Sequence, residues 1–288
     1  MTLIVGVRTT SRIALLSDTR ITHPDVTQVE ELPGRLKLVM LSPTICVGYA
    51  GPAEQGIDHV RRIPMADRAT FDAVVAHLRT LRECDFVVAE SSSLRQTTIK
   101  AGSVHEAPLV YIGDDDAWTA LEAIRPTVPL PVSGDPGAGI DPEESFVSTV
   151  MSAFRHVLTS PAYPTVAGFQ MRVGSRADGF HYLYEAGFTF VNVTGPLNES
   201  TAGQFSDAAA GGYSYTVLAP REAGHAVVAV HIQQGPLGFI YAPLHHDRPD
   251  KVPEVDQAGL CEYVKEHYGV EIDGLRPINS GFQTPSHG

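Results

Sequence analysis

The chain has 288 residues, with 21 lysines and arginines against 33 aspartates and glutamates, which gives a net charge of −12 at pH 7. An acidic chain without a basic stripe argues against binding to nucleic acid or to an anionic membrane. A chain of this length can bury a sizeable core and is longer than a typical single domain, so we expect one domain with an elaboration.

The cysteines and the apolar runs predict a cytoplasmic protein. The three cysteines are an odd number without C-x-x-C spacing, which predicts neither a disulfide framework nor a zinc knuckle and favours a reducing compartment. The apolar chain start meets Arg8 too soon for a signal peptide, and no apolar run approaches the length of a membrane span. We expect no membrane partner and no cofactor.

Apolar periodicity predicts a mixed α and β protein whose early strands are antiparallel, because short turns connect them. Apolar residues alternate or form short runs where we expect strands, and they recur every three or four residues where we expect helices. The expected strands are 2–7, 13–16, 36–41, 44–50, 85–90, 96–101, 104–112, 168–174, 179–185, 214–218, 226–233 and 237–241, and the expected helices are about 53–62, 70–83, 114–123, 143–158 and 255–267.

Two short segments invite a metal-binding interpretation that we do not favour. Residues 114–116 are three consecutive aspartates, but acidic residues before a helix are ordinary capping chemistry. Residues 244–247 contain two adjacent histidines, but they lack the paired H-x-x-H or C-x-x-C spacing of a metal site, and a surface turn is the better interpretation. The sequence therefore predicts no metal site.

Thr2 can carry a nucleophile and a base on one residue. It follows Met1, and a methionine before so small a residue is normally removed, which would leave Thr2 with a free α-amino group. The hydroxyl is a poor nucleophile at neutral pH, and an α-amine with a reference pKa of about 7.7–8 can accept its proton directly or through one water. This chemistry also needs a carboxylate and a cation close by.

Asp18 and Lys37 are the expected carboxylate and cation. A hairpin between residues 2–8 and 13–17 would return the end of its second strand to the chain start, beside Thr2. Lys37 opens a third apolar run, and its charge in a low-dielectric site would hold Asp18 ionised and favour the deprotonated threonine oxygen. The alternative is a turn with a surface ion pair after residue 17 and a solvated lysine.

Four segments at the start of the chain share their residues and spacing with a known family. They are Thr2-Leu-Ile-Val-Gly-Val7, Ser17-Asp-Thr-Arg-Ile-Thr22, Lys37-Leu-Val39 and Gly48-Tyr-Ala-Gly51. Together they resemble proteasome β subunits and their bacterial relatives, which are N-terminal nucleophile hydrolases. Segments near residues 86–113 and 166–180 resemble the central strands and the last hairpin of that family, so the resemblance covers about residues 2–190.

The resemblance implies a fold and a mechanism. The fold would be α+β, a four-layer α/β/β/α sandwich over residues 2–190, followed by a C-terminal α/β extension over 191–288 whose role is unknown. Thr2 would attack an amide carbonyl while its own α-amine moves the proton, the N–H of Gly51 would bind the oxyanion, and water would then cleave the acyl-enzyme.

The resemblance also implies a substrate cleft. An extended peptide would pair with the backbone of Thr22 as an added strand, and the side chains of Ile21 and Tyr49 would shape the first pocket. The full set of expected substrate-binding residues is Arg20, Ile21, Thr22, Tyr49 and Ala53.

Two departures from the family concern residues that support the α-amine. Active members usually carry a serine after the glycine that ends the central hairpin, whereas Gly113 is followed here by Asp114. An Asp-x-x-Ser pair usually precedes the last hairpin, whereas this chain has no aspartate there and only Thr165 as a weak substitute. These changes bear on rate and pH optimum more than on the identity of the nucleophile.

Three functions stay open at this point. The first is a threonine peptidase that forms rings, the second is an amidohydrolase or acyl transferase dedicated to one small amide, and the third is a non-catalytic scaffold subunit that retains Met1. The expected partners are a peptide or amide substrate and further copies of the chain, because relatives cover their sheet edges by assembling into rings. The C-terminal extension could instead cover these surfaces, which would favour a dimer.

Overall fold

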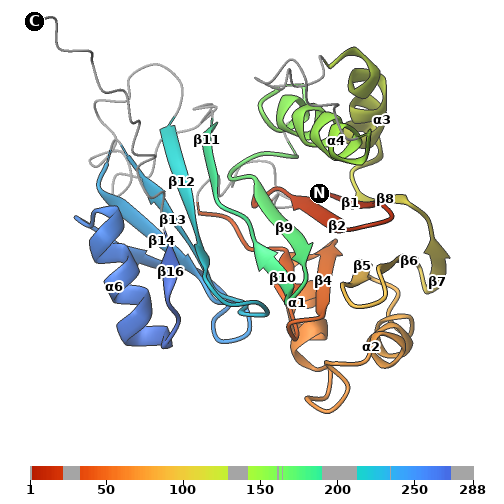
Figure 1. Cartoon of the computed structure of the whole chain (residues 1–288), viewed down its shortest axis with the longest axis horizontal. Helices are drawn as coiled ribbons and strands as arrows, with labels where there is room; N and C mark the ends of the chain where they lie inside the picture. Colours follow the sequence, from red (N-terminus) through yellow and green to blue (C-terminus); the bar gives the residue numbers. More distant parts are fainter. Residues whose placement is uncertain are drawn as a thin grey trace, which may run out of the picture.

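The computed structural model describes residues 2–21, 33–128, 142–160, 162–163, 165–189, 213–233 and 235–273. Over these ranges the chain is a mixed α and β protein whose strands form three sheets, and neighbouring strands in each sheet run antiparallel (Figure 1). The predicted class of a mixed, largely antiparallel protein is therefore confirmed.

The first sheet holds the chain start in its interior. β1 (Leu3–Arg8) lies between β2 (Ile13–Ser17) and β8 (Leu109–Gly113), while β9 (Met171–Arg176) and β10 (Gly179–Tyr182) extend the sheet beyond β2. Both faces of β1 and β2 are covered, which explains why their sequences are almost continuously apolar.

The second sheet follows chain order. Short turns connect its strands except between the second and the third, where residues 51–84 intervene, and the strand at its free edge, β7, is exposed along its whole length. The strands are β3 (Leu38–Met40), β4 (Ile45–Ala50), β5 (Asp85–Glu90), β6 (Arg95–Lys100) and β7 (Ser103–Glu106).

The third sheet comes from the C-terminal part of the chain. Its strands also follow chain order, and a short last strand, β16, pairs with β12. The strands are β11 (Glu185–Thr189), β12 (Tyr213–Pro220), β13 (Val228–Ile232), β14 (Leu237–Tyr241), β15 (Asp250–Val252) and β16 (Ile272–Asp273).

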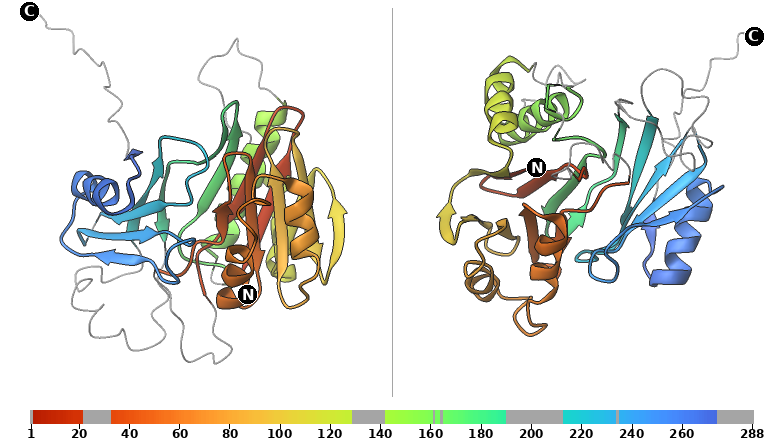
Figure 2. Two further views of the ribbon diagram at one scale, coloured as in Figure 1. Left: turned by 90° about the horizontal axis from the view of Figure 1, so that it is seen from below. Right: turned by 180° about the vertical axis from the view of Figure 1, so that it is seen from behind.

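Helices cover the outer face of each sheet. α1 and α2 pack on the second sheet, α3 and α4 pack on the first, and α6 packs on the third, each through its own hydrophobic cluster. Figures 1 and 2 show the pair α3 and α4 on one side of the first two sheets and the pair α1 and α2 on the other. The helices are α1 (Ala53–Arg61), α2 (Phe71–Leu78), α3 (Asp115–Ile124) with a 3-10 turn (Arg125–Thr127) after it, α4 (Pro142–Leu158) and α6 (Gln257–Tyr268).

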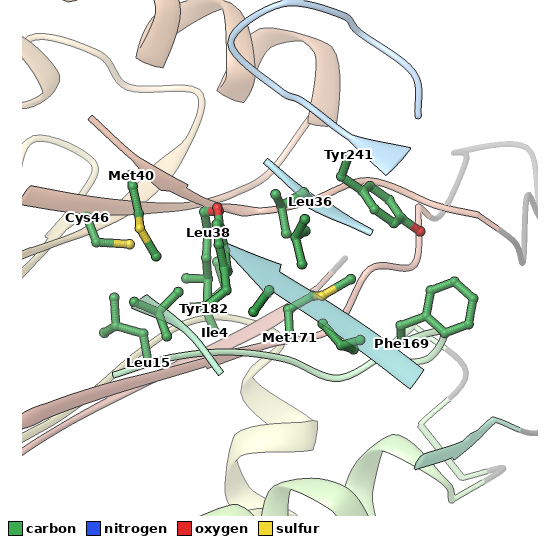
Figure 3. Close-up of a cluster of buried hydrophobic side chains, with 14 of the residues drawn as sticks. Ile4, Leu15, Leu36, Leu38, Met40, Cys46, Phe169, Met171, Tyr182 and Tyr241 are labelled. Carbon is green, nitrogen blue, oxygen red and sulfur yellow. The ribbon is translucent and has the colours of Figure 1, made fainter. Parts of the chain in front are cut away.

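One hydrophobic cluster is shared by the inner faces of all three sheets. Figure 3 shows Ile4 and Leu15 of the first sheet, Leu38 and Cys46 of the second, and Tyr241 of the third within it. The third sheet therefore shares its core with the sheets that hold the chain start, instead of burying its inner face by itself.

The expected strand over 104–112 is wrong, because the structure has two strands there. β7 pairs with β6 in the second sheet, whereas β8 pairs with β1 in the first. Pro108 lies between them and has no N–H to donate to a ladder, so pairing breaks at this residue and the chain crosses from one sheet to the other.

The expected helix over 70–83 is too long, and α2 ends at Leu78. The hydroxyl of Thr80 donates to the carbonyl of His77 at 2.8 Å, and such local bonds compete with continued helix. The expected strand over 179–185 is also divided, because β10 ends at Tyr182 and β11 begins the third sheet at Glu185.

The burial and pairing of Glu185 explain why the chain passes from the first sheet to the third at this residue. Its carboxylate is buried and forms ion pairs with Arg155 of α4 and with Arg172 of β9, the latter at 2.6 Å. A buried carboxylate is tolerated only when it is paired, so these two arginines fix the start of β11 beside the first sheet.

None of the helices in the described ranges has both the length and the apolar character needed to cross a lipid bilayer.

Four buried tyrosines predict how stability depends on pH. Burial raises the pKa of Tyr49, Tyr182, Tyr215 and Tyr241 above the ordinary value. Above about pH 10 these phenols ionise in the unfolded chain and stay protonated in the folded one, so the unfolded state binds fewer protons. The free energy of unfolding should therefore fall as pH rises through this range, by up to about 1.4 kcal/mol per pH unit for each tyrosine. Urea denaturation between about pH 8 and 11 measures this slope.

The matched variant is Tyr182→Phe, which keeps the ring and removes one phenol. It loses the hydrogen bond from that hydroxyl to the carbonyl of Leu38, 2.6 Å long, so it should be less stable at neutral pH but should lose less stability per pH unit above pH 10. An alkaline slope equal to that of the wild type would contradict the prediction.

Candidate active site

The first hairpin brings the end of β2 back to the chain start. Ile4 pairs with Ser17 in the register of β1 and β2, so Asp18 follows directly beyond the paired residues. The main-chain N–H of Leu3 donates to Asp18 Oδ1 at 3.2 Å. The predicted hairpin and its placement of Asp18 beside Thr2 are confirmed.

The side chains of Thr2, Asp18 and Lys37 meet in one three-way contact. The Thr2 hydroxyl donates to Asp18 Oδ1, and Lys37 Nζ lies 2.5 Å from Thr2 Oγ1 and 3.0 Å from Asp18 Oδ2. The third donor of the ammonium reaches the carbonyl of Arg20 at 2.5 Å. Lys37 therefore places positive charge directly on the threonine oxygen, where it would stabilise an alkoxide.

This contact lies almost entirely out of solvent. Thr2 and Lys37 are each 3 % exposed and Asp18 is fully buried. Burial lowers the pKa of Lys37 from its ordinary value, and the neighbouring carboxylate of Asp18 acts against that effect. Asp18 therefore favours the protonated form of Lys37, and loss of that carboxylate would leave the effect of burial unopposed.

The main chain of Thr2 is held by the turn after β8. The N–H of Asp114 donates to the carbonyl of Thr2 at 2.7 Å. Gly113 precedes it with φ at +102°, and a Cβ at that position would lie 1.9 Å from the Thr2 carbonyl oxygen. Only glycine fits there, because any side chain would displace Thr2.

Asp114 and Thr165 form a pair that the sequence did not reveal. The Thr165 hydroxyl donates to Asp114 Oδ2, while Oδ1 caps α3 by accepting the N–H of Ala117 at 2.9 Å. The expected capping role of Asp114 is thus confirmed, and Thr165 contacts a carboxylate although no aspartate precedes it in its own segment. The available signal was the acidic residue directly after Gly113.

The other expected site residues lie on the two segments that leave this contact. Arg20 is buried, and its main-chain N–H donates to the carbonyl of Ala167 at 3.1 Å. Ile21 is half-exposed at the end of a described range, and Thr22 lies outside the described residues. Gly51 is exposed at the turn between β4 and α1 with φ at +117°, and half-exposed Ala53 begins α1.

Tyr49 packs beneath α1 and also lines a small hollow with Tyr241 and Ala242 of the C-terminal part. Its ring packs beneath α1, where a Cβ on Gly56 would lie 2.3 Å from a ring carbon. Its hydroxyl donates to the carbonyl of Leu36 at 3.0 Å. Tyr49 therefore fixes the segment before Lys37 against the helix, and its ring is only 2 % exposed.

The segment with two adjacent histidines forms a turn, as expected. The N–H groups of His245 and His246 both donate to the carbonyl of Ala242, at 2.8 and 2.9 Å. Within the described ranges, no three His, Cys, Asp or Glu side chains come close enough together to hold a metal ion.

Removal of Lys37 tests the energetics of the three-way contact. Lys37→Met should lower the free energy of unfolding by about 3–5 kcal/mol, because Asp18 remains as a buried carboxylate without its cation. Adding Asp18→Asn should restore most of this loss, since both charges are then absent. Urea denaturation of the two single variants and the double variant measures the coupling.

Lys265→Met is the matched control, because it removes the cation of an exposed ion pair between α6 and Glu271, just before β16. Exposed pairs contribute little, so this variant should denature close to the wild type. Additive losses for Lys37→Met and Asp18→Asn would show that these two side chains do not interact.

Comparisons with known proteins provide no family assignment. A scan against protein-family models finds no model that matches the chain, and a search of the curated proteins finds no matching protein. Any function therefore has to be inferred from the residues of the site and from their geometry.

Proposed function

We propose that this chain is a threonine-type N-terminal nucleophile hydrolase, similar to proteasome β subunits, that cleaves peptide or amide bonds through an acyl-enzyme on Thr2. The observation that carries the proposal is the buried contact of Lys37 Nζ with both Thr2 Oγ1 and Asp18. A hydroxyl that accepts a hydrogen bond from a buried ammonium is activated as a nucleophile, which a structural threonine does not require.

In the proposed reaction, Thr2 Oγ attacks the carbonyl carbon of the amide. Its proton passes to the α-amine of Thr2, directly or through one water, and then to the nitrogen of the leaving amine. The N–H of Gly51 binds the developing oxyanion, a contact that is typically worth about 2.7–4 kcal/mol in acyl transfer. Water then cleaves the ester on Thr2, with the α-amine as its base.

Asp18 and Lys37 act on the nucleophile without forming bonds to substrate in this proposal. Lys37 stabilises the threonine oxygen as negative charge develops, and Asp18 keeps Lys37 protonated. Asp114 and Thr165 hold the main chain of Thr2 from the other side, so we assign them as positioning residues.

The arrangement of layers supports the proposed family. Two sheets share an inner cluster, and a helix pair covers the outer face of each, which is the order of a four-layer α/β/β/α sandwich. We propose this architecture for residues 2–190, with the remaining residues as a C-terminal extension whose sheet packs into the same inner cluster.

A hydrolase dedicated to one small amide is the second candidate. The observation that favours it is the burial of Thr2, Asp18 and Lys37 beside a cluster to which the third sheet contributes. A site so enclosed suits a compact substrate better than a long extended peptide. Both candidates use the same nucleophile and need the α-amine of Thr2, so both require that Met1 is removed.

Covalent labelling and mutation of Thr2 test the proposal. The protein purified from its native cell should have the mass of a chain without Met1, should cleave a fluorogenic peptide amide, and should add one β-lactone molecule at Thr2. Thr2→Ala should lose activity and labelling by at least about a hundredfold and keep its fold, because the Lys37–Asp18 ion pair remains.

Thr2→Ser is the matched control, since serine retains a hydroxyl on the same residue and should keep measurable activity. Hydrolysis by Thr2→Ala at the wild-type rate would refute the proposed nucleophile. A retained Met1 together with absent labelling would leave the chain as a non-catalytic scaffold.

We further propose that the chain forms a homo-oligomer. Among the described residues β7 is an exposed edge strand that pairs with β6 on one side only, and Val104 on it is 43 % exposed although it is apolar. Exposed edges of this kind favour pairing with another chain.

Light scattering tests the assembly against a monomer mass of 31.0 kDa. The wild type should show a multiple of this mass, and Val104→Lys should shift it towards the monomer, because a charge blocks edge pairing. Met65→Lys is the control, since Met65 is 76 % exposed and lies outside the strand. A strictly monomeric wild type would rule out assembly and would favour the small-amide hydrolase.

A further inference from the structure

The two segments that carry Asp18 and Lys37 cross at one tightly packed point. The main-chain N–H of Arg35 donates to the carbonyl of Thr19 at 2.7 Å, so each segment is held by the other close to its charged residue. Gly34 stands at this crossing with φ at +66°, and a Cβ on it would lie 2.0 Å from the Thr19 carbonyl oxygen. Glycine is required there, because the approach of the two chains leaves no room for a side chain.

A tyrosine of the C-terminal sheet reaches into the crossing. The hydroxyl of Tyr241, on β14, donates to the carbonyl of Pro33, and the Thr19 side chain forms a hydrogen bond with the same phenol. The Thr19 hydroxyl oxygen in turn accepts the main-chain N–H of Phe169 at 2.9 Å. Figure 3 shows Tyr241 beside Leu36, which belongs to the same segment as Pro33. A continuous chain of hydrogen bonds therefore connects the third sheet with both crossing segments.

The crossing lies close in the chain to both charges that contact Thr2. Thr19 follows Asp18 directly, and the carbonyl of Arg20 accepts a hydrogen bond from Lys37 Nζ at 2.5 Å. The positions of the carboxylate and of the ammonium on the threonine oxygen therefore depend on how firmly the crossing is held. A misplacement of about 1 Å at a catalytic group can lower a rate by about a hundredfold.

Three buried tyrosine hydroxyls bind carbonyls of the segment that carries Lys37. Tyr49 donates to the residue before Lys37 at 3.0 Å, and Tyr182 donates to the residue after it at 2.6 Å. These two tyrosines belong to the first two sheets, whereas Tyr241 comes from the third. Burial raises the pKa of Tyr241 well above its ordinary value, so its hydroxyl remains a hydrogen-bond donor at neutral pH.

We propose that Tyr241 is a positioning residue of the active site, which holds Asp18 and Lys37 against Thr2 through the crossing of their segments. The C-terminal sheet then supports the nucleophile directly, because without this hydroxyl the ion pair forms but is not held at the geometry that activates the threonine oxygen. This inference rests on the proposed hydrolase function. Its physical basis, a coupling between Tyr241 and the ion pair, can be measured without turnover.

Tyr241→Phe keeps the ring and removes only the hydroxyl. With the fluorogenic peptide amide, kcat of this variant should fall by about tenfold or more, because misplaced groups slow the chemical step. KM should stay within about twofold of the wild type, since Tyr241 is 2 % exposed and does not reach a bound substrate. The rate at which the β-lactone labels Thr2 should fall by the same factor as kcat.

Tyr215→Phe is the matched control. Tyr215 lies on the same sheet, is also 2 % exposed and belongs to the same inner cluster, and its hydroxyl accepts the main-chain N–H of Gln170 at 3.0 Å. This variant also loses a buried hydrogen bond but keeps the crossing, so its kcat should stay near that of the wild type. An equal loss of kcat in both tyrosine variants would assign the effect to general loosening of the core and would overturn the proposal.

Thr19 supplies a second set of variants at the crossing. Thr19→Val removes the hydroxyl at nearly constant shape and should lower kcat as Tyr241→Phe does, whereas Thr19→Ser retains the hydroxyl and should keep most of the activity. The combination of Thr19→Val with Tyr241→Phe should be no slower than the slower single variant, since both changes break the same chain of bonds. Rate losses that multiply would show that the two hydroxyls act separately, which contradicts the proposal.

Urea denaturation gives the readout that does not depend on turnover. Tyr241→Phe should lower the urea midpoint of the wild type by more than it lowers that of the double variant Asp18→Asn/Lys37→Met, because only the wild type has an ion pair whose geometry can be lost. Equal shifts in the two backgrounds, or a wild-type kcat for Tyr241→Phe, would overturn the proposed role. Unequal shifts in a protein that cleaves no amide would refute the hydrolase function and leave Tyr241 as the residue that positions the ion pair.

Discussion

The buried ion pair between Lys37 and Asp18, in contact with the Thr2 hydroxyl, is the interaction on which the rest of the site depends. Removing two charges from water is costly, and the cost is offset only when the remaining donors and acceptors are also satisfied. The structure meets this condition through the N–H of Leu3 and the carbonyl of Arg20. The hairpin register is constrained for the same reason, because a slip of one residue would turn Asp18 to the opposite face.

The sequence was informative wherever short connections determine which residues meet. A four-residue turn sets the pairing of β1 and β2, so the position of Asp18 beside Thr2 followed from hairpin geometry, and α3 began at its expected aspartate cap. Long-range packing could not be predicted in this way. The crossing at Pro108, the change of sheet at Glu185 and the bond from Arg35 to Asp247 all depend on partners that lie far apart in the chain.

Tyr49 and its neighbour Ala50 show what a correct strand prediction leaves open. β4 was expected, but neighbouring residues of a strand point to opposite faces, and Tyr49 belongs to the cluster under α1 while Ala50 belongs to the central one. The central cluster also explains why the C-terminal sheet is not an independent unit. Its tyrosine and phenylalanine side chains pack against the same residues that support β1, so the two parts are expected to unfold together.

The position of β1 inside the first sheet has a consequence for synthesis on the ribosome. β1 is made long before its neighbour β8, which begins at Leu109, and β2 waits for β9, which begins at Met171. At about 5–20 residues per second, roughly ten to thirty seconds separate the first strand from the last one that completes the sheet around it. Thr2 is therefore not fixed in a nascent chain until the residues of β9 have been translated.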